Sequence, residues 1–216
     1  MFNKTSHFKL GLIYFFLMII LEMILPEWTG DENGIIENLQ LLWLIAGFLY
    51  CFNARKSHFY KWCNDTKSLW NAGMIYFFLL FMREISWGRT FFTNPDGSII
   101  QYSQMGLFGK LVHPIVALLI IALVFLLYQA RVWLMLRTIK FPTTSFIMLL
   151  AFIFASWVGE KANFTGFHGQ VAEELAEFGA YMMMFLLLYD AGDQLKINAL
   201  VHYLWLGRPS PIFVLD

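Results

Sequence analysis

Apolar residues occur in six long blocks along the chain, and shorter polar segments separate the blocks. The blocks cover residues 10–25, 35–52, 69–87, 111–128, 143–158 and 171–189. Several are close to the lower limit of about 17 residues that a helix needs to cross the hydrocarbon core of a bilayer. The pattern predicts an all-α polytopic membrane bundle with six transmembrane helices.

Composition and tryptophan placement favour the same class of protein. Hydrophobic residues make up 59% of the chain and charged residues only 14%, whereas a water-soluble domain usually carries about 25% charged residues. Trp28, Trp87 and Trp157 fall at one set of block ends, and Trp62, Trp70, Trp133 and Trp205 fall at the other. Two such groups are typical of the aromatic belts at the two bilayer interfaces.

Basic residues predict the orientation of the bundle. Eleven of the fifteen Lys and Arg residues lie in the N-terminal segment, in the loops after the second and fourth blocks, and in the C-terminal tail. Because Lys and Arg are enriched in cytoplasmic loops, both termini are expected in the cytoplasm and the protein in the plasma (inner) membrane. We expect the bundle to occupy residues 1–190, and residues 191–216 to form a short cytoplasmic or interfacial tail.

The remaining composition limits the partners. Cys51 and Cys63 fall on the predicted cytoplasmic side, where a structural disulfide is not expected. The formal net charge is zero and no run of basic residues is present, so nucleic acid is not an expected partner. The expected partners are the lipid bilayer and either a lipid head group or another membrane protein.

Acidic residues concentrate on the side opposite the basic loops. Eleven of the fifteen Asp and Glu residues lie at or near those block ends: Glu22, Glu27, Asp31, Glu32, Glu37, Glu84, Asp96, Glu160, Glu173, Glu174 and Glu177. Ionisable groups near hydrocarbon are costly, so they are usually either functional or paired. The outward ends of the spans are therefore where a site is expected.

A first candidate group closes the third block, in the string Met82-Arg-Glu-Ile-Ser-Trp-Gly-Arg89. Arg83 and Trp87 are four residues apart and share a helical face. Glu84 is a candidate acid or base, and Arg83, Trp87 and Arg89 are candidate substrate-binding residues. An interfacial Arg–Glu pair with a Trp anchor is the structural alternative.

A second candidate group opens the sixth block. Glu173, Glu174 and Glu177 are spaced so that at least two carboxylates lie on one helical face. Like charges at this spacing repel unless a metal ion, a shared proton or a basic residue neutralises them. The helix macrodipole favours acids in a first turn, which explains Glu173 and Glu174 better than Glu177.

If the helices form one bundle, these groups converge on an outward-facing carboxylate and histidine pocket. A divalent metal there would be held by His113 and His168 with Glu84, Glu173 or Glu177. Glu84, Glu177 and His113 are the candidate catalytic residues. Glu37 and Glu173 are further candidate binding residues. A single histidine such as His113 is more often structural than a metal ligand.

The string Glu84-Ile-Ser-Trp-Gly88 resembles a motif of uncharacterised bacterial multi-pass membrane proteins, in which it runs Glu-Glu-Ile-Ser-Trp-Gly-Gln-Arg. The resemblance covers about residues 80–185, and it implies a multi-pass topology without assigning an activity. Arg83 and Arg89 stand where that family has Glu and Gln, so chemistry that needs paired glutamates does not carry over.

Three functions are compatible with these patterns. The charges could pair among themselves in a structural or partner-binding subunit. They could instead serve a membrane-embedded enzyme, metal-dependent or not, that acts on a lipid or lipid-linked substrate. The third function is transport of an ion or small solute, which is disfavoured by the nearly pure apolar segments 74–80 and 182–188.

Overall fold

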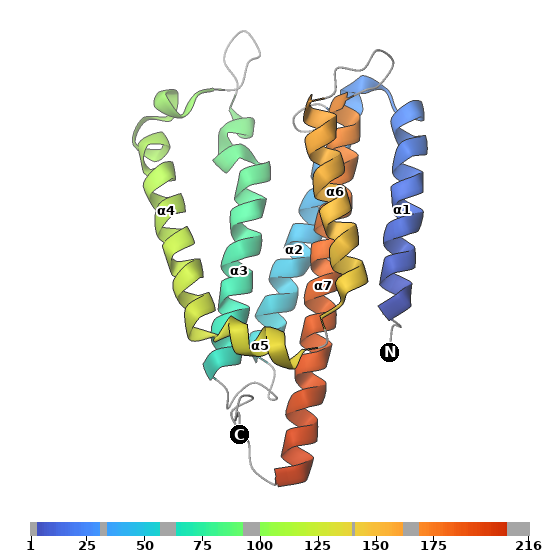
Figure 1. Cartoon of the computed structure of the whole chain (residues 1–216). Coiled ribbons are helices and arrows are strands. Elements are labelled where there is room, and N and C mark those ends of the chain that lie inside the picture. Colours follow the sequence, from blue (N-terminus) through green and yellow to red (C-terminus); the bar gives the residue numbers. More distant parts are fainter. Residues whose placement is uncertain are drawn as a thin grey trace. The chain divides into compact units, whose positions relative to one another are not determined.

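The computed structural model describes residues 4–30, 34–56, 64–92, 100–139, 141–161 and 169–206. Every regular element in these ranges is a helix, which confirms the all-α prediction (Figure 1). The α-helices are α1 (Lys4–Ile24), α2 (Ile35–Lys56), α3 (Asn64–Glu84), α4 (Gly106–Gln129), α5 (Val132–Thr138), α6 (Thr143–Lys161) and α7 (Gly169–Leu206). The connections in these ranges contain the 3-10 helices η1 (Glu27–Gly30), η3 (Ser86–Phe91) and η4 (Tyr102–Met105).

Residue contacts divide the chain into two compact units. Unit 1 consists of Met1–Leu44 and Phe141–Asp190, and unit 2 consists of Ile45–Lys140 and Ala191–Asp216. Helices α2 and α7 begin in unit 1 and end in unit 2. The predicted boundary between bundle and tail, at residue 190, therefore falls inside α7, at the point where the chain passes from one unit to the other.

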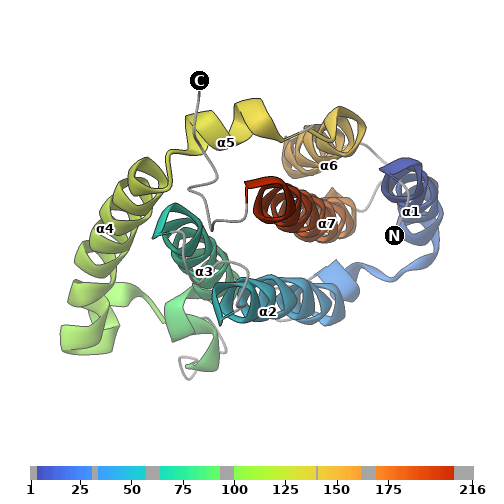
Figure 2. The same ribbon diagram turned by 90° about the horizontal axis from the view of Figure 1, so that it is seen from below.

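In unit 1, α1, α6 and the first half of α7 are neighbours (Figure 2). Phe152 of α6 is fully buried, and its ring centroid lies 5.6 Å from that of Tyr14 on α1. A Cβ atom added to Gly179 of α7 would lie only 2.7 Å from the Phe152 ring. The helices can therefore pack closely around this aromatic pair only because residue 179 is a glycine, which has no side chain.

In unit 2, α3 and α4 pack against each other and run in opposite directions (Figure 1). The second half of α2 packs on α3, where a Cβ atom added to Gly73 would lie 2.6 Å from the sulfur of Cys51. Trp70 of α3 is almost completely buried, with its ring 5.8 Å from that of Tyr50 on α2. Small residues therefore let these two helices approach closely, as in many membrane bundles.

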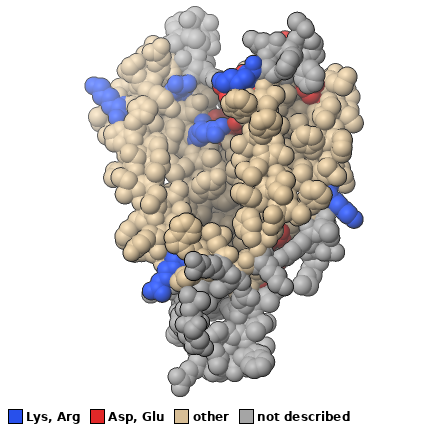
Figure 3. Space-filling view, in the orientation of Figure 1, with Lys and Arg blue, Asp and Glu red and all other residues tan. Residues whose placement is uncertain are grey.

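Four described segments are long and apolar enough to cross a membrane: His7–Ile24, Glu27–Lys56, Tyr102–Gln129 and Thr143–Lys161. They correspond to α1, α2, α4 and α6, and together they indicate a multi-pass membrane protein. Helix α4 is the least buried of them and exposes large apolar side chains such as Leu118, Ile121 and Val124. The face of α4 is uncharged between the basic atoms at its two ends (Figure 3). An apolar surface of this extent is typical of a lipid-facing helix.

The other two predicted spans fall in α3 and α7, which are long enough to cross a membrane but less apolar over that length. Helix α3 carries charged residues near both of its ends, and α7 has acids at its start and again at Asp190 and Asp193. Helix α7 extends beyond its predicted block at both ends, and α3 begins before its block but ends three residues before the block does. A helix can continue into polar sequence where an apolar block stops. Six spans and cytoplasmic termini remain predictions.

Candidate functional site

The first turns of α7 lie in very close contact with neighbouring backbone in unit 1. A Cβ atom added to Gly30 of η1 would lie 2.8 Å from the backbone nitrogen of Val171. A Cβ atom added to Gly159 of α6 would lie 2.9 Å from the backbone nitrogen of Glu173. Real Cβ atoms do not approach backbone this closely, so two glycines fix where the acidic start of α7 lies.

Gln40 of α2 is fully buried and bonds directly to this acidic segment. Its Nε2 atom donates to both the backbone carbonyl and the carboxylate Oε2 of Glu174, at 2.8 Å in each case. The Gln40 Oε1 atom is buried without a hydrogen-bond partner among the described residues. A buried carbonyl oxygen of this kind usually has a donor, so this is a position where a polar group could still be accommodated.

Two further side chains attach neighbouring helices to α7. Tyr14 of α1 donates from its hydroxyl group to the backbone carbonyl of Leu175, at 2.9 Å. Ser156 of α6 donates to the carboxylate of Glu177 at 3.4 Å, a long hydrogen bond. The Glu177 carboxylate therefore has a hydroxyl partner. Because α7 begins at Gly169, its first turn contains no acid. Glu173 and Glu174 lie in the second turn and Glu177 in the third, where the macrodipole contributes less than predicted.

A buried polar pair lies farther along α7. Nδ1 of His7 on α1 is 2.9 Å from Oδ2 of Asp190, and the two side chains are only 6% and 10% exposed. These residues are 183 positions apart in the chain. Buried polar groups of this kind are costly without each other, so the pair fixes α1 against α7.

In unit 2, the first candidate group lies where α3 ends. The Arg83 side chain is 60% exposed and its Nε atom is 3.4 Å from Oε1 of Glu84, whose side chain is only 6% exposed. Ser86, Trp87 and Gly88 follow with positive φ angles of 45°, 54° and 84°. The left-handed conformation is costly for Ser and Trp, so this motif ends the helix in a strained turn.

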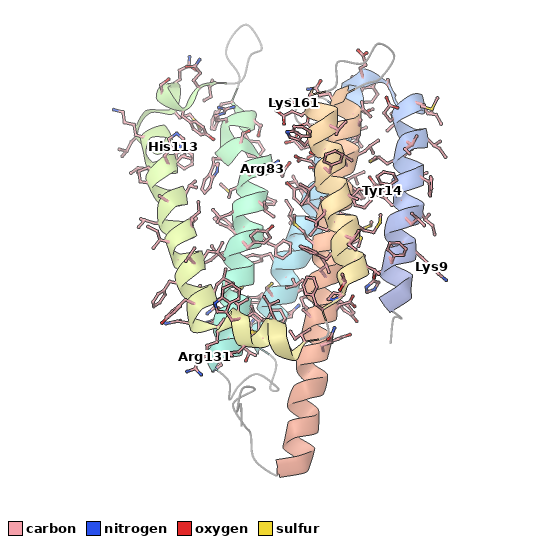
Figure 4. All side chains as sticks on the ribbon, in the orientation of Figure 1. Lys9, Tyr14, Arg83, His113, Arg131 and Lys161 are labelled. Atoms are coloured by element: carbon pink, nitrogen blue, oxygen red, sulfur yellow. The ribbon has the colours of Figure 1, made fainter. Side chains whose placement is uncertain are left out.

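Tyr102 of η4 connects this turn to α4. Its hydroxyl group donates to the Ser86 carbonyl at 3.3 Å, and the Cζ atom of Arg89 lies 4.8 Å from its ring centroid. The imidazole ring of His113 packs against the same tyrosine with a centroid distance of 5.5 Å. Figure 4 shows Arg83 and His113 toward the same end of the α3–α4 pair, and Arg131 at the other end.

Charge is distributed unequally between the two units. Near the predicted outward helix ends, the described residues of unit 1 comprise seven acids and one base: Glu22, Glu27, Glu37, Glu160, Glu173, Glu174, Glu177 and Lys161. Those of unit 2 comprise one acid and three bases: Glu84, Arg83, Arg89 and Lys110. Within the described chain, most acids at the predicted outward helix ends belong to unit 1, and most basic residues at these ends belong to unit 2.

The predicted site residues accordingly fall into two sets. Glu37, Glu173 and Glu177 belong to unit 1, whereas Arg83, Glu84, Trp87, Arg89 and His113 belong to unit 2. His168, Asp31, Glu32 and Asp96 lie outside the described residues. Within the ranges that the structure describes, no three His, Cys, Asp or Glu side chains are grouped so that they could hold a metal ion. The predicted metal site, which included His168, stays a prediction.

Several residues of these clusters were not singled out from sequence. Tyr102 carries no motif, and its role depends on the contact between η4 and α4. His7 and Asp190 each lie within or beside an apolar block, and an ionisable residue in that position is a recognisable signal. Their pairing, however, connects opposite ends of the chain and cannot be read from spacing.

Comparison with known proteins adds no assignment. No protein-family model, no curated protein and no solved structure matches this chain.

Proposed function

We propose that the protein is a six-span integral protein of the plasma (inner) membrane, with cytoplasmic termini and a structural or partner-binding role. One observation carries the role: α1, α2 and α6 each bond to α7 through a polar side chain, namely Tyr14, Gln40 and Ser156. Interhelical hydrogen bonds in membrane proteins contribute about 0.6 kcal/mol each on average and fix helix register. Polar side chains that hold helices together in this way favour a structural role for the protein.

The proposed topology adds α3 and the first half of α7 to the four candidate spans. Single cysteines introduced into a variant without Cys51 and Cys63 test it with a membrane-impermeant maleimide on intact cells. We expect labelling within residues 93–99 and 162–168, and none within residues 57–63 or at either terminus. Labelling of the N-terminal segment from outside would contradict the orientation.

The scaffold role is tested by replacing the polar side chains that contact α7. Gln40→Leu and Tyr14→Phe should lower the melting temperature of the detergent-solubilised protein, and combining them should lower it further. Unchanged melting temperatures in both variants would remove the support for this role. The resemblance of Glu84-Ile-Ser-Trp-Gly88 to uncharacterised bacterial membrane proteins remains part of the proposal.

A membrane-embedded enzyme acting on a lipid or lipid-linked substrate is the second candidate. The strained segment Ser86–Gly88, between Glu84 and Arg89, favours it, because strained backbone is frequent at active sites. Glu84 would act as the acid or base, and Arg89 would hold a phosphate. Metal content and lipid turnover of the wild type, Glu84→Gln and Glu177→Gln test it. A turnover lost in a well-folded Glu84→Gln variant would establish the enzyme over the scaffold.

A further inference from the structure

Arg89 has an incomplete set of partners. Its guanidinium group lies against the face of Tyr102, and within the described part of the chain it forms no ion pair with a carboxylate. Its Nε atom is buried without a hydrogen-bond acceptor among the same residues. Buried guanidinium donors almost always have an acceptor, so an acceptor supplied from outside the described chain would complete this set.

Two further basic residues lie in the first turns of α4, the helix that η4 contacts. His113 packs against Tyr102, and Lys110 is three residues before it on α4, so the two project from neighbouring positions of one helical face. Both side chains are exposed, and Lys110 pairs with no acid in the ranges described by the structure. Glu84, the described acid at this end of unit 2, is already 3.4 Å from Arg83.

The position of this group suggests what binds it. It lies where α3 ends and α4 begins, and α4 is the helix that exposes the most continuous apolar surface. In the proposed bilayer the ends of α4 are at the depth of lipid head groups, where tyrosine rings are also enriched. Arginine binds phosphate through two parallel N–H donors, and basic groups between transmembrane helices bind anionic head groups.

We propose that Arg89 and His113, which both contact Tyr102, and Lys110, one turn before His113, bind the phosphate group of an anionic membrane lipid. The inference rests on the proposed membrane embedding. Arg89 provides the directional donors, and Lys110 adds a point charge. Tyr102 holds the Arg89 guanidinium in place through its ring, and holds the turn through its hydrogen bond to Ser86.

The test is native mass spectrometry of the full-length protein, released from mixed phosphatidylglycerol and phosphatidylcholine nanodiscs. We expect the wild type to retain phosphatidylglycerol selectively. Arg89→Gln should weaken this retention at least tenfold, and Lys110→Gln severalfold. Arg131→Gln is the matched control, because it removes one positive charge from the opposite end of α4 (Figure 4) and should leave retention unchanged.

Two outcomes would overturn the proposal: unchanged retention in Arg89→Gln and Lys110→Gln, or an equal loss in Arg131→Gln, which would indicate non-specific attraction to charge. If Arg89→Gln does not fold, Lys110→Gln decides alone, since its side chain is exposed and unpaired among the described residues. Binding of inorganic phosphate without retention of phosphatidylglycerol would identify a soluble phosphate ligand and overturn the lipid assignment.

A separate measurement keeps this proposal distinct from the membrane embedding on which it rests. Alkaline carbonate extraction should leave the wild type and all three variants in the membrane fraction. A protein that is embedded but does not select phosphatidylglycerol contradicts only the head-group site. A protein that carbonate extracts from the membrane contradicts the proposed function as well.

Discussion

Gln40 and Glu174 are joined twice through one side-chain amide, which donates to both the backbone carbonyl and the carboxylate of the glutamate, at 2.8 Å each. The two residues are 134 positions apart, on α2 and α7. Gln40 therefore binds both the main chain and the side chain of Glu174. A shift of α7 along its axis by one residue would break both hydrogen bonds.

Gln40→Leu should destabilise the protein by about 1–3 kcal/mol, because it removes a buried donor from a carboxylate and a carbonyl group. For a chain of this size each kcal/mol corresponds to about 2–4 °C in melting temperature. The measurement is thermal unfolding in detergent followed by tryptophan fluorescence. Gln129→Leu is the control, because Gln129 is exposed and accepts a hydrogen bond of 3.3 Å from Ser68 at the surface. A melting-temperature shift as large in this variant would show that burial of the hydrogen bond does not matter.

Replacing one partner of the buried pair His7–Asp190 should have a larger effect. His7→Leu leaves a buried carboxylate without this partner, and removing one member of such a pair typically costs about 3–5 kcal/mol. The double variant His7→Leu/Asp190→Leu should recover most of the loss, because an apolar pair needs no hydrogen bond. A double variant no more stable than His7→Leu would show that the pair does not act as a unit.

An exposed ion pair on α7 provides the comparison for that experiment. Lys196 and Asp193 are 3.4 Å apart, with side chains 40% and 45% exposed. Exposed pairs contribute at most about 1 kcal/mol, so Lys196→Gln should change the melting temperature only slightly. Equal effects of Lys196→Gln and His7→Leu would contradict the importance of burial.

Gly159→Ala should lower stability by about 1–3 kcal/mol through overpacking. The new Cβ atom would meet the backbone of Glu173 at 2.9 Å and the Gly169 carbonyl at 3.1 Å, and backbone cannot move aside locally. Gly11→Ala is the matched control, because its Cβ atom would meet the flexible Met183 side chain at 3.1 Å. Equal melting temperatures for the two variants would contradict the close approach of α6 and α7.

Leu118→Arg distinguishes a lipid-facing α4 from a water-exposed one. Leu118 is 65% exposed, so in water the substitution should change stability by less than about 0.5 kcal/mol. In a bilayer an arginine at mid-helix costs about 2.5–3.5 kcal/mol for insertion. We expect much less Leu118→Arg protein in the membrane fraction, with Leu107→Arg at the helix end tolerated because its side chain can reach the interface. Equal recovery of both would place α4 outside the bilayer.

The sequence predicted the helical class and the position of each long helix, since apolar blocks are the strongest signal in a membrane protein. Helix ends were less accurate. The predicted third span ran to residue 87, but α3 ends at Glu84. Glycine at position 88 signals a left-handed turn, whereas nothing in the residue types of Ser86 or Trp87 does so.

The candidate site was predictable in composition but not in arrangement. Sequence spacing brings acids to similar depths, but helix rotation and neighbours depend on tertiary packing. For this reason Gln40 and Tyr102, which belong to no sequence motif, form key hydrogen bonds in the structure. Glu177 and His113 are predicted at similar depths in the membrane, but they belong to different compact units, which the sequence does not reveal.

The length of α7 has a practical consequence for any experiment on the intact protein. Its 38 residues correspond to about 57 Å at 1.5 Å per residue, whereas the hydrocarbon core is only about 30 Å thick. In the proposed topology part of α7 therefore lies outside the hydrocarbon core, while the turn after Asp190 still packs within unit 2, where Leu195 is fully buried. A fluorophore attached near Leu206 would therefore sense the aqueous phase beyond the lipid surface.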